Sequence, residues 1–164
     1  WKNNVGKDFN ESKPFKVNSV DGFSMLINKK FLTEHYFDEN FFLYLENDDL
    51  CLRAIKSGGN IYIIPSAKIN HKAAKAIDQK YAKEIEKSRN WHWIWSKFYF
   101  NKKHYGFIKA FLEGFPRFIS SLFNYLFFFL INNKRKKKIY LNRALGFYNA
   151  LINKPSWYRP NLDD

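Results

Sequence analysis

Several residue types and motifs that define common classes of protein are scarce or missing. The chain has a single cysteine, Cys51, among 164 residues, so an internal disulfide framework is excluded and a reducing compartment is favoured. It contains no GxxxxGKS/T phosphate loop, no GxGxxG turn, no GxSxG elbow and no zinc-site spacing of Cys and His. These absences remove several classes of enzyme. The polar N-terminus does not resemble a signal peptide, and a first residue other than Met favours a fragment.

Acidic residues are outnumbered by basic ones. There are 15 Asp and Glu against 28 Lys and Arg, which gives a net charge of +13. This excess of positive charge favours an anionic partner. The candidates are nucleic acid, an anionic membrane and a phosphorylated substrate. The composition, 46% hydrophobic and 26% charged, predicts a globular chain with room for one domain or part of a larger one.

The chain also lacks a run of about 20 apolar residues, which a membrane-spanning helix needs. Its most apolar segment, residues 118–131, has 14 residues and predicts an interfacial, re-entrant or buried helix, so entry into lipid is left open. A basic block at residues 134–138 follows directly. The block suits an anionic cytoplasmic leaflet, at about 1 kcal/mol per basic residue near the surface. If residues 118–131 are buried in protein, a solvated basic loop fits the block equally well.

Short periodic segments make up most of the remaining chain. Strand-like composition is found at residues 17–27, interrupted by Asp21-Gly22, and at residues 60–65. Helices are expected at residues 31–36, 46–56, 73–88 and 140–152. Residues 89–100 are dense in aromatic rings, and the alternation of Trp91, Trp93 and Trp95 fits a strand as well as a helix.

Three carboxylates, those of Glu46, Asp48 and Asp49, lie at the start of the helix expected at residues 46–56. Close carboxylates suit general-base chemistry on a sugar hydroxyl or a water. Their mutual repulsion should raise one pKa toward neutral pH. The alternative is an acidic first turn without chemistry, because the helix dipole favours acidic residues there.

Three runs of sequence stand in order over residues 17–72: DGFSMLI from Asp21, FDENFFLY from Phe37, and ENDDLCLR from Glu46. Gly58, Gly59, Ile61, Pro65 and His71 follow at matching positions. Together these motifs resemble family 2 glycosyltransferases, and more narrowly the rhamnosyltransferase-like members that build bacterial surface polysaccharides. The aromatic segment from Arg89 to Phe100 is similar to the C-terminal extension of some of these enzymes.

The resemblance implies an α/β fold: the C-terminal, acceptor-side portion of a GT-A glycosyltransferase, over residues 1–72, followed by a mostly helical, aromatic-rich and membrane-associated extension, over residues 73–164. The implied activity is inverting transfer of a sugar from a nucleotide-sugar donor to a lipid-linked or polysaccharide acceptor. The implied location is the cytoplasmic face of the bacterial inner membrane. The family's donor-binding half has no counterpart before Val17, so the chain is expected to be inactive alone.

By the same resemblance, Glu46, Asp48 and Asp49 are the catalytic residues. The family usually has Asp at the second position of the acidic motif, where this chain has Asn47. An amide cannot accept the proton, so either another carboxylate of the cluster substitutes or the activity of this chain is altered. Among the three carboxylates, Glu46 is the favoured base. Asp21, Gly22, Asn47 and Arg53 are expected to bind substrate, although Arg53 is also expected to pair with a carboxylate. His71 is expected to lie beside a divalent metal, Mg or Mn, whose other ligands would lie in the donor half.

Two other classes of function fit parts of the sequence. A basic, aromatic-rich chain can bind nucleic acid by neutralising phosphates and stacking on bases. This function is disfavoured, because the basic residues are dispersed outside residues 134–138 and the acidic cluster would repel phosphates. The other is a non-catalytic membrane-associated scaffold in which the acidic motif only caps a helix.

Overall fold

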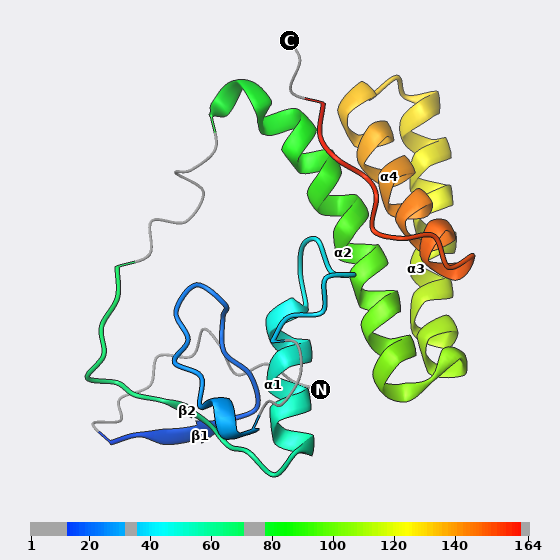
Figure 1. Ribbon diagram of the computed structural model, residues 1–164. Coiled ribbons are helices and arrows are strands. Elements are labelled where there is room, and N and C mark those ends of the chain that lie inside the picture. Colours follow the sequence, from blue (N-terminus) through cyan, green and yellow to red (C-terminus); the bar gives the residue numbers. More distant parts are fainter. Residues whose placement is uncertain (1–12, 32–35, 71–77, 162–164) are drawn as a thin grey trace. The chain divides into compact units, whose positions relative to one another are not determined.

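The computed structural model describes residues 13–31, 36–70 and 78–161 and divides the chain into two compact units (Figure 1). The first, here called the sheet unit, comprises Trp1–Glu39 and Leu45–Ala73. The second, here called the helical unit, comprises Asn40–Tyr44 and Ala74–Asp164. Each unit is described by itself.

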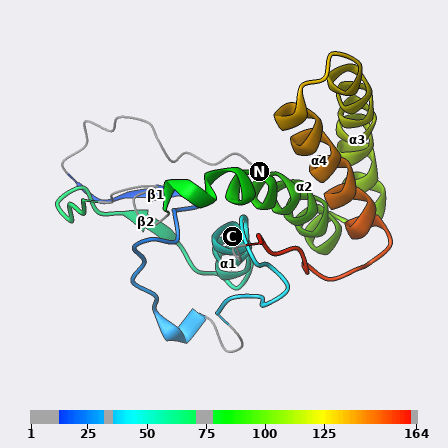
Figure 2. The same cartoon turned by 90° about the horizontal axis from the view of Figure 1, so that it is seen from above.

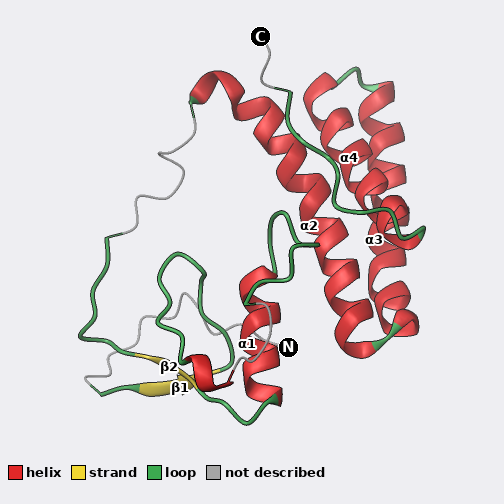
Figure 3. Ribbon diagram, in the orientation of Figure 1, coloured by secondary structure: helices red, strands yellow, loops and turns green. Residues whose placement is uncertain are grey.

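Helices are the main regular structure of the described residues. Of the described residues, 60% are helical and 4% are in strands, which form one two-stranded sheet (Figure 3). The prediction that residues 1–72 form the α/β portion of a GT-A fold is therefore wrong. Strands β1 (Phe15–Val17) and β2 (Ile61–Ile63) pair antiparallel, with Phe15 opposite Ile63. Of the strand expected at residues 17–27, only Val17 lies in a described strand. Residues 23–27 have no ladder partner in the described structure, and backbone without a partner does not form a strand.

The sheet unit contains the first α-helix, α1 (Glu46–Lys56), at the place expected from the sequence. Leu50, Cys51, Leu52 and Ala54 are buried along it. The helix ends where Gly58 adopts a left-handed backbone, with φ of 86°, and donates to the Ile55 carbonyl at 3.0 Å. Of the helix expected at residues 31–36, two residues are described: Phe31 ends a single 3-10 turn, η1 (Lys29–Phe31), and Tyr36 lies in a bend. The strand expected at residues 60–65 is confirmed in its middle, as β2.

The helical unit consists of a 3-10 turn, η2 (Gln79–Tyr81), and three long helices that pack pairwise (Figures 1 and 2). These helices are α2 (Ala82–Tyr105), α3 (Phe107–Leu130) and α4 (Lys134–Leu151). The aromatic stretch at residues 89–100 is helical, and the reason is visible in its burial. Trp91 and Trp95, one turn apart, are buried and stack at 6.3 Å, whereas Trp93 is exposed.

The core of the helical unit lies where the three helices meet. It comprises Trp91, Ile94, Trp95, Phe98, Ala110, Phe147 and Ala150. Helices α2 and α4 approach closely at Gly146, where an added Cβ would lie 2.4 Å from the Trp91 carbonyl oxygen. The C-terminal segment runs along the helices (Figure 1) and accepts a hydrogen bond from Trp95 Nε1 at the Lys154 carbonyl, at 3.0 Å.

The basic block at residues 134–138 forms the first turns of α4, so its alternative interpretation as a loop is wrong. Asn133 caps this helix by accepting a hydrogen bond from the Lys136 amide at 3.0 Å. The apolar segment 118–131 lies in α3, which also carries Lys109, Glu113 and Arg117. In the described ranges, no helix has both the length and the apolar character that crossing a membrane requires.

Candidate active site at the start of helix α1

The chain enters α1 through a strained turn. Tyr44 and Leu45 have φ of 69° and 68°, in the left-handed region that costs a non-glycine residue about 1–2 kcal/mol. Leu45 is the N-cap residue, and its side chain cannot cap the helix, but its carbonyl accepts from the Asp49 amide at 2.8 Å. Backbone strain of this kind is concentrated at functional sites. Here it directly precedes Glu46.

Two of the three carboxylates are engaged in bonds within the sheet unit. Asp48 is buried and accepts a hydrogen bond from the hydroxyl of Ser19. Asp49 is fully buried and accepts from Arg53 Nε at 2.8 Å, one turn along the helix. Arg53 also donates to the Tyr36 carbonyl. Asp48, Asp49 and Arg53 therefore connect α1 to the segments around it.

Glu46 is the remaining carboxylate of the cluster. Its Oε2 atom is buried and, within the part of the chain that the structure describes, has no hydrogen-bond partner. Burial raises the pKa of Glu46, and the charge of Asp48 raises it further, against the opposing effect of a bond from its own backbone amide. Glu46 thus combines an unsatisfied oxygen with a raised pKa, which are the properties of a general base.

The loop that contains Asp21 and Gly22 lies against this first turn. Asn47 Nδ2 donates to the Val20 carbonyl at 2.8 Å, and a Cβ added to Gly22 would lie 3.5 Å from the Cβ of Asn47. The structure therefore brings together Gly22 and Asn47, both expected to bind substrate. In this arrangement the Asn47 amide orients the loop.

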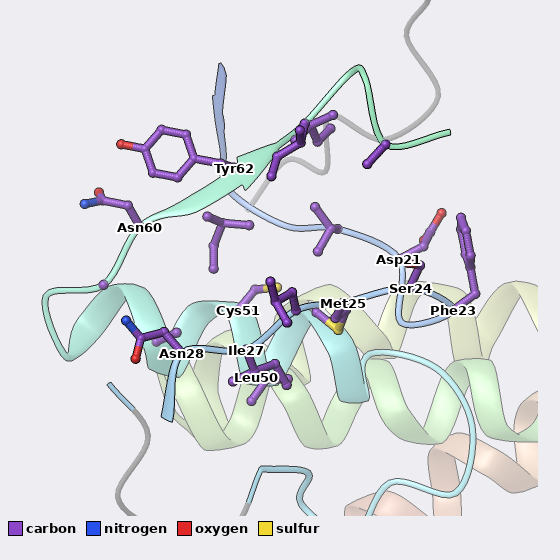
Figure 4. A pocket seen from close by; sticks show the side chains of 18 of the residues that line it. Asp21, Phe23, Ser24, Met25, Ile27, Asn28, Leu50, Cys51, Asn60 and Tyr62 are labelled. Carbon is purple, nitrogen blue, oxygen red and sulfur yellow. The ribbon is translucent and has the colours of Figure 1, made fainter. Parts of the chain in front are cut away.

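A pocket of about 590 Å³ opens beside the same loop (Figure 4). Asp21 and Val20 line it together with α1 and β2. Figure 4 shows Met25, Ile27, Leu50 and Cys51 close together on the α1 side of the pocket. Polar side chains lie toward its two ends: Asp21 and Ser24 at one, and Asn28, Asn60 and Tyr62 at the other. An apolar pocket of this size with a few polar groups at its edge is typical of small-ligand sites.

The expected divalent metal stays a prediction, because its other ligands were expected outside this chain. Across the described ranges, no group of three or more His, Cys, Asp or Glu side chains is placed to hold an ion. Asp48 and Asp49 instead accept from Ser19 and Arg53. His71, the expected metal residue, lies outside the described residues.

Ser19, the Val20 carbonyl and the pocket residue Cys51 were not expected at the site. Ser19 and Asp48 are 29 positions apart, so no local pattern in the sequence relates them. Cys51 is buried, and burial raises the pKa of its thiol, which keeps the thiol neutral and unreactive. Its presence in the pocket wall is a packing role.

Comparison with known proteins gives no match for this chain, whether against protein-family models, curated proteins or solved structures.

Proposed function

We propose that the start of α1 catalyses glycosyl transfer, with Glu46 as the general base. In the proposed inverting step, Glu46 takes the proton of an acceptor hydroxyl. The hydroxyl oxygen bonds to the anomeric carbon of a nucleotide-sugar donor, and the bond to the nucleotide diphosphate breaks. The acceptor is a lipid-linked or polysaccharide sugar at the cytoplasmic face of a bacterial inner membrane. The sequence motifs around Glu46 support this substrate class.

The observation that carries the proposal is the buried, unsatisfied Oε2 of Glu46. An isolated buried carboxylate oxygen costs free energy, so a role in binding a proton or a hydroxyl explains its retention. Asp48 and Asp49 are weaker choices, because their oxygens accept from Ser19 and Arg53. The neighbouring pocket supports binding of the acceptor, since Asp21 is part of its wall.

The test is sugar transfer by the longest natural polypeptide that contains this sequence, with a panel of nucleotide sugars and a membrane extract as acceptor. Glu46→Gln should lower kcat by roughly 10²–10⁴-fold, which is the usual worth of a general base. The matched control is Asp48→Asn, which keeps an oxygen to accept from Ser19. The control should retain activity within a few-fold. The base is misassigned if Asp48→Asn abolishes transfer while Glu46→Gln does not.

The pH profile gives a second check on the same residue. Glu46 acts as a base only when ionised, and its pKa is raised above the ordinary 4.5. The rate of sugar transfer should therefore increase as the pH rises through this raised pKa. The increase should be absent in Glu46→Gln.

A non-catalytic scaffold is the second candidate, favoured by the structural bonds of Asp48 and Asp49. It predicts that the unaltered polypeptide transfers no sugar and hydrolyses no donor. It also predicts that Glu46→Gln retains the cellular function.

A further inference from the structure

Helix α3 carries an exposed face that contains no charged residue. Six residues on this face are more than half exposed, and we call them the apolar stripe: Ile108, Leu112, Phe123, Leu126, Phe129 and Leu130. Their spacing places them on one side of the helix over its whole length. An extended exposed apolar face of this kind marks a contact with a protein or a membrane.

The charged residues of α3 lie on a different side. Asn101 of α2 donates to Glu113 at 3.0 Å, and Arg117 donates to the Glu113 carbonyl. Lys109 lies over the ring of Tyr105, with Nζ 4.0 Å from its centroid. The opposite side of the helix packs into the core through Ala110, Ser121 and Phe128. The segregation of charged from apolar residues is that of an amphipathic helix.

A cluster of lysines adjoins one end of the stripe. Lys136 Nζ lies 4.8 Å from the ring centroid of Phe128, and Lys137 Nζ lies 4.9 Å from that of Phe129, which belongs to the stripe. Lys134 and Lys138 are exposed in the same turns of α4. Arg135 is instead bound to Glu86 of α2, at 2.7 and 2.9 Å.

These lysines lie where a helix is least favourable for them. The first turn of α4 contains no acidic residue, and the positive end of a helix dipole repels cations. The backbone amides at this end and the lysines together favour an anion. Their placement is explained by binding to negative groups outside the chain.

We propose that α3 docks flat on an anionic lipid bilayer, with the apolar stripe at the acyl boundary and the lysines of α4 at the headgroup phosphates. The bilayer matches both features, because it presents apolar chains beside negative headgroups. A second copy of this chain would present the same lysine-flanked face and no acidic counterpart. This inference does not rest on the glycosyltransferase proposal.

The test is co-sedimentation of the whole chain with vesicles of phosphatidylcholine and phosphatidylglycerol, compared with phosphatidylcholine alone. Binding should require the anionic lipid and weaken with added salt. Leu126→Glu should weaken binding at least about tenfold, because it places a charge in the stripe. Lys136→Glu combined with Lys137→Glu should also weaken it about tenfold or more, because both attractions are lost.

The matched control is Leu26→Glu, at a fully exposed leucine of the sheet unit, which should bind vesicles as the unaltered chain does. Circular dichroism should show that Leu126→Glu is folded, since Leu126 is exposed. Equal binding to neutral and anionic vesicles would overturn the proposal, as would unchanged binding by Leu126→Glu. Absence of vesicle binding, with self-association that Leu126→Glu abolishes, would assign the stripe to a second copy instead. Glu46→Gln should bind vesicles normally, so the two proposals can fail separately.

Discussion

Ser88 and Ser96 lie on the same helix, α2, and both are buried, but among the described residues a hydrogen-bond partner is found for Ser96 and not for Ser88. The Ser96 hydroxyl donates to the Leu43 carbonyl at 2.7 Å, whereas the Ser88 hydroxyl has no partner in the described ranges. Ser88→Ala should therefore raise the unfolding free energy by roughly 0.5–1 kcal/mol, because it removes an unsatisfied group and favours the helix. Ser96→Ala should lower it by roughly 1 kcal/mol, because the Leu43 carbonyl loses its donor.

Urea unfolding followed by tryptophan fluorescence measures both changes. The two variants serve as controls for each other, because the substitution and the helix are the same. A loss of stability in Ser88→Ala similar to that in Ser96→Ala would mean that the Ser88 hydroxyl is satisfied.

At the scale of elements, the sequence predicts helices with strong local signals and misses contacts made at a distance. Helix α1 is predictable, since acidic residues begin it and two glycines follow it. The α/β class was wrong because a strand requires a partner that local sequence does not identify, as residues 23–27 illustrate. The bond between Ser19 and Asp48 and the bond between Asn47 and Val20 were missed for the same reason.

The packing of α2 on α4 depends on the absence of a side chain at Gly146. A Cβ there would meet the carbonyl oxygen of Trp91 at 2.4 Å and its carbonyl carbon at 3.2 Å, and backbone cannot move aside without shifting the helix. Gly146→Ala should therefore destabilise the helical unit by roughly 2 kcal/mol, despite the higher helix propensity of alanine. Thermal or urea unfolding measures the effect.

Gly114→Ala is the comparison for this prediction. Its added Cβ would meet the ring of Phe147, at 2.5 Å, rather than backbone. A ring can rotate away more easily, so the loss of stability should be smaller than in Gly146→Ala. Stabilisation by Gly146→Ala, the ordinary result for a helix glycine with free space around it, would contradict the close approach of the two helices.

At the scale of the whole molecule, the two proposals concern different units of the chain. The proposed base lies at the start of α1 in the sheet unit, whereas the apolar stripe lies on α3 in the helical unit. The net charge of +13 suggests an anionic partner from sequence alone, but it does not identify the surface. The surface is identified by the position of the lysines beside Phe128 and Phe129, which depends on the turn between α3 and α4.

The stability of the helical unit should depend on pH through His92. This side chain is fully buried, and its ring bonds to the C-terminal segment at both nitrogens. Nε2 lies 2.7 Å from the Tyr158 carbonyl, which can only accept, so Nε2 carries the proton. Nδ1 therefore accepts from the Ser156 hydroxyl, at 2.9 Å. The neutral ring satisfies both bonds, and a second proton would break the one to Ser156.

Burial lowers the pKa of His92, and the charge of Arg159 lowers it further, against the opposing effect of the Tyr158 carbonyl. Below the ordinary pKa of 6.5, His92 is therefore protonated in the unfolded chain but stays neutral in the folded chain until the pH reaches the lowered pKa. The unfolding free energy should be constant above this pH and should fall as the pH decreases from 6.5 toward the lowered pKa.

The melting temperature, measured by tryptophan fluorescence above the range where carboxylates titrate, should show the decline. His92→Gln should remove it, while His104→Gln, on the last turn of α2, should retain it. A decline that persists in His92→Gln would place the titrating group elsewhere.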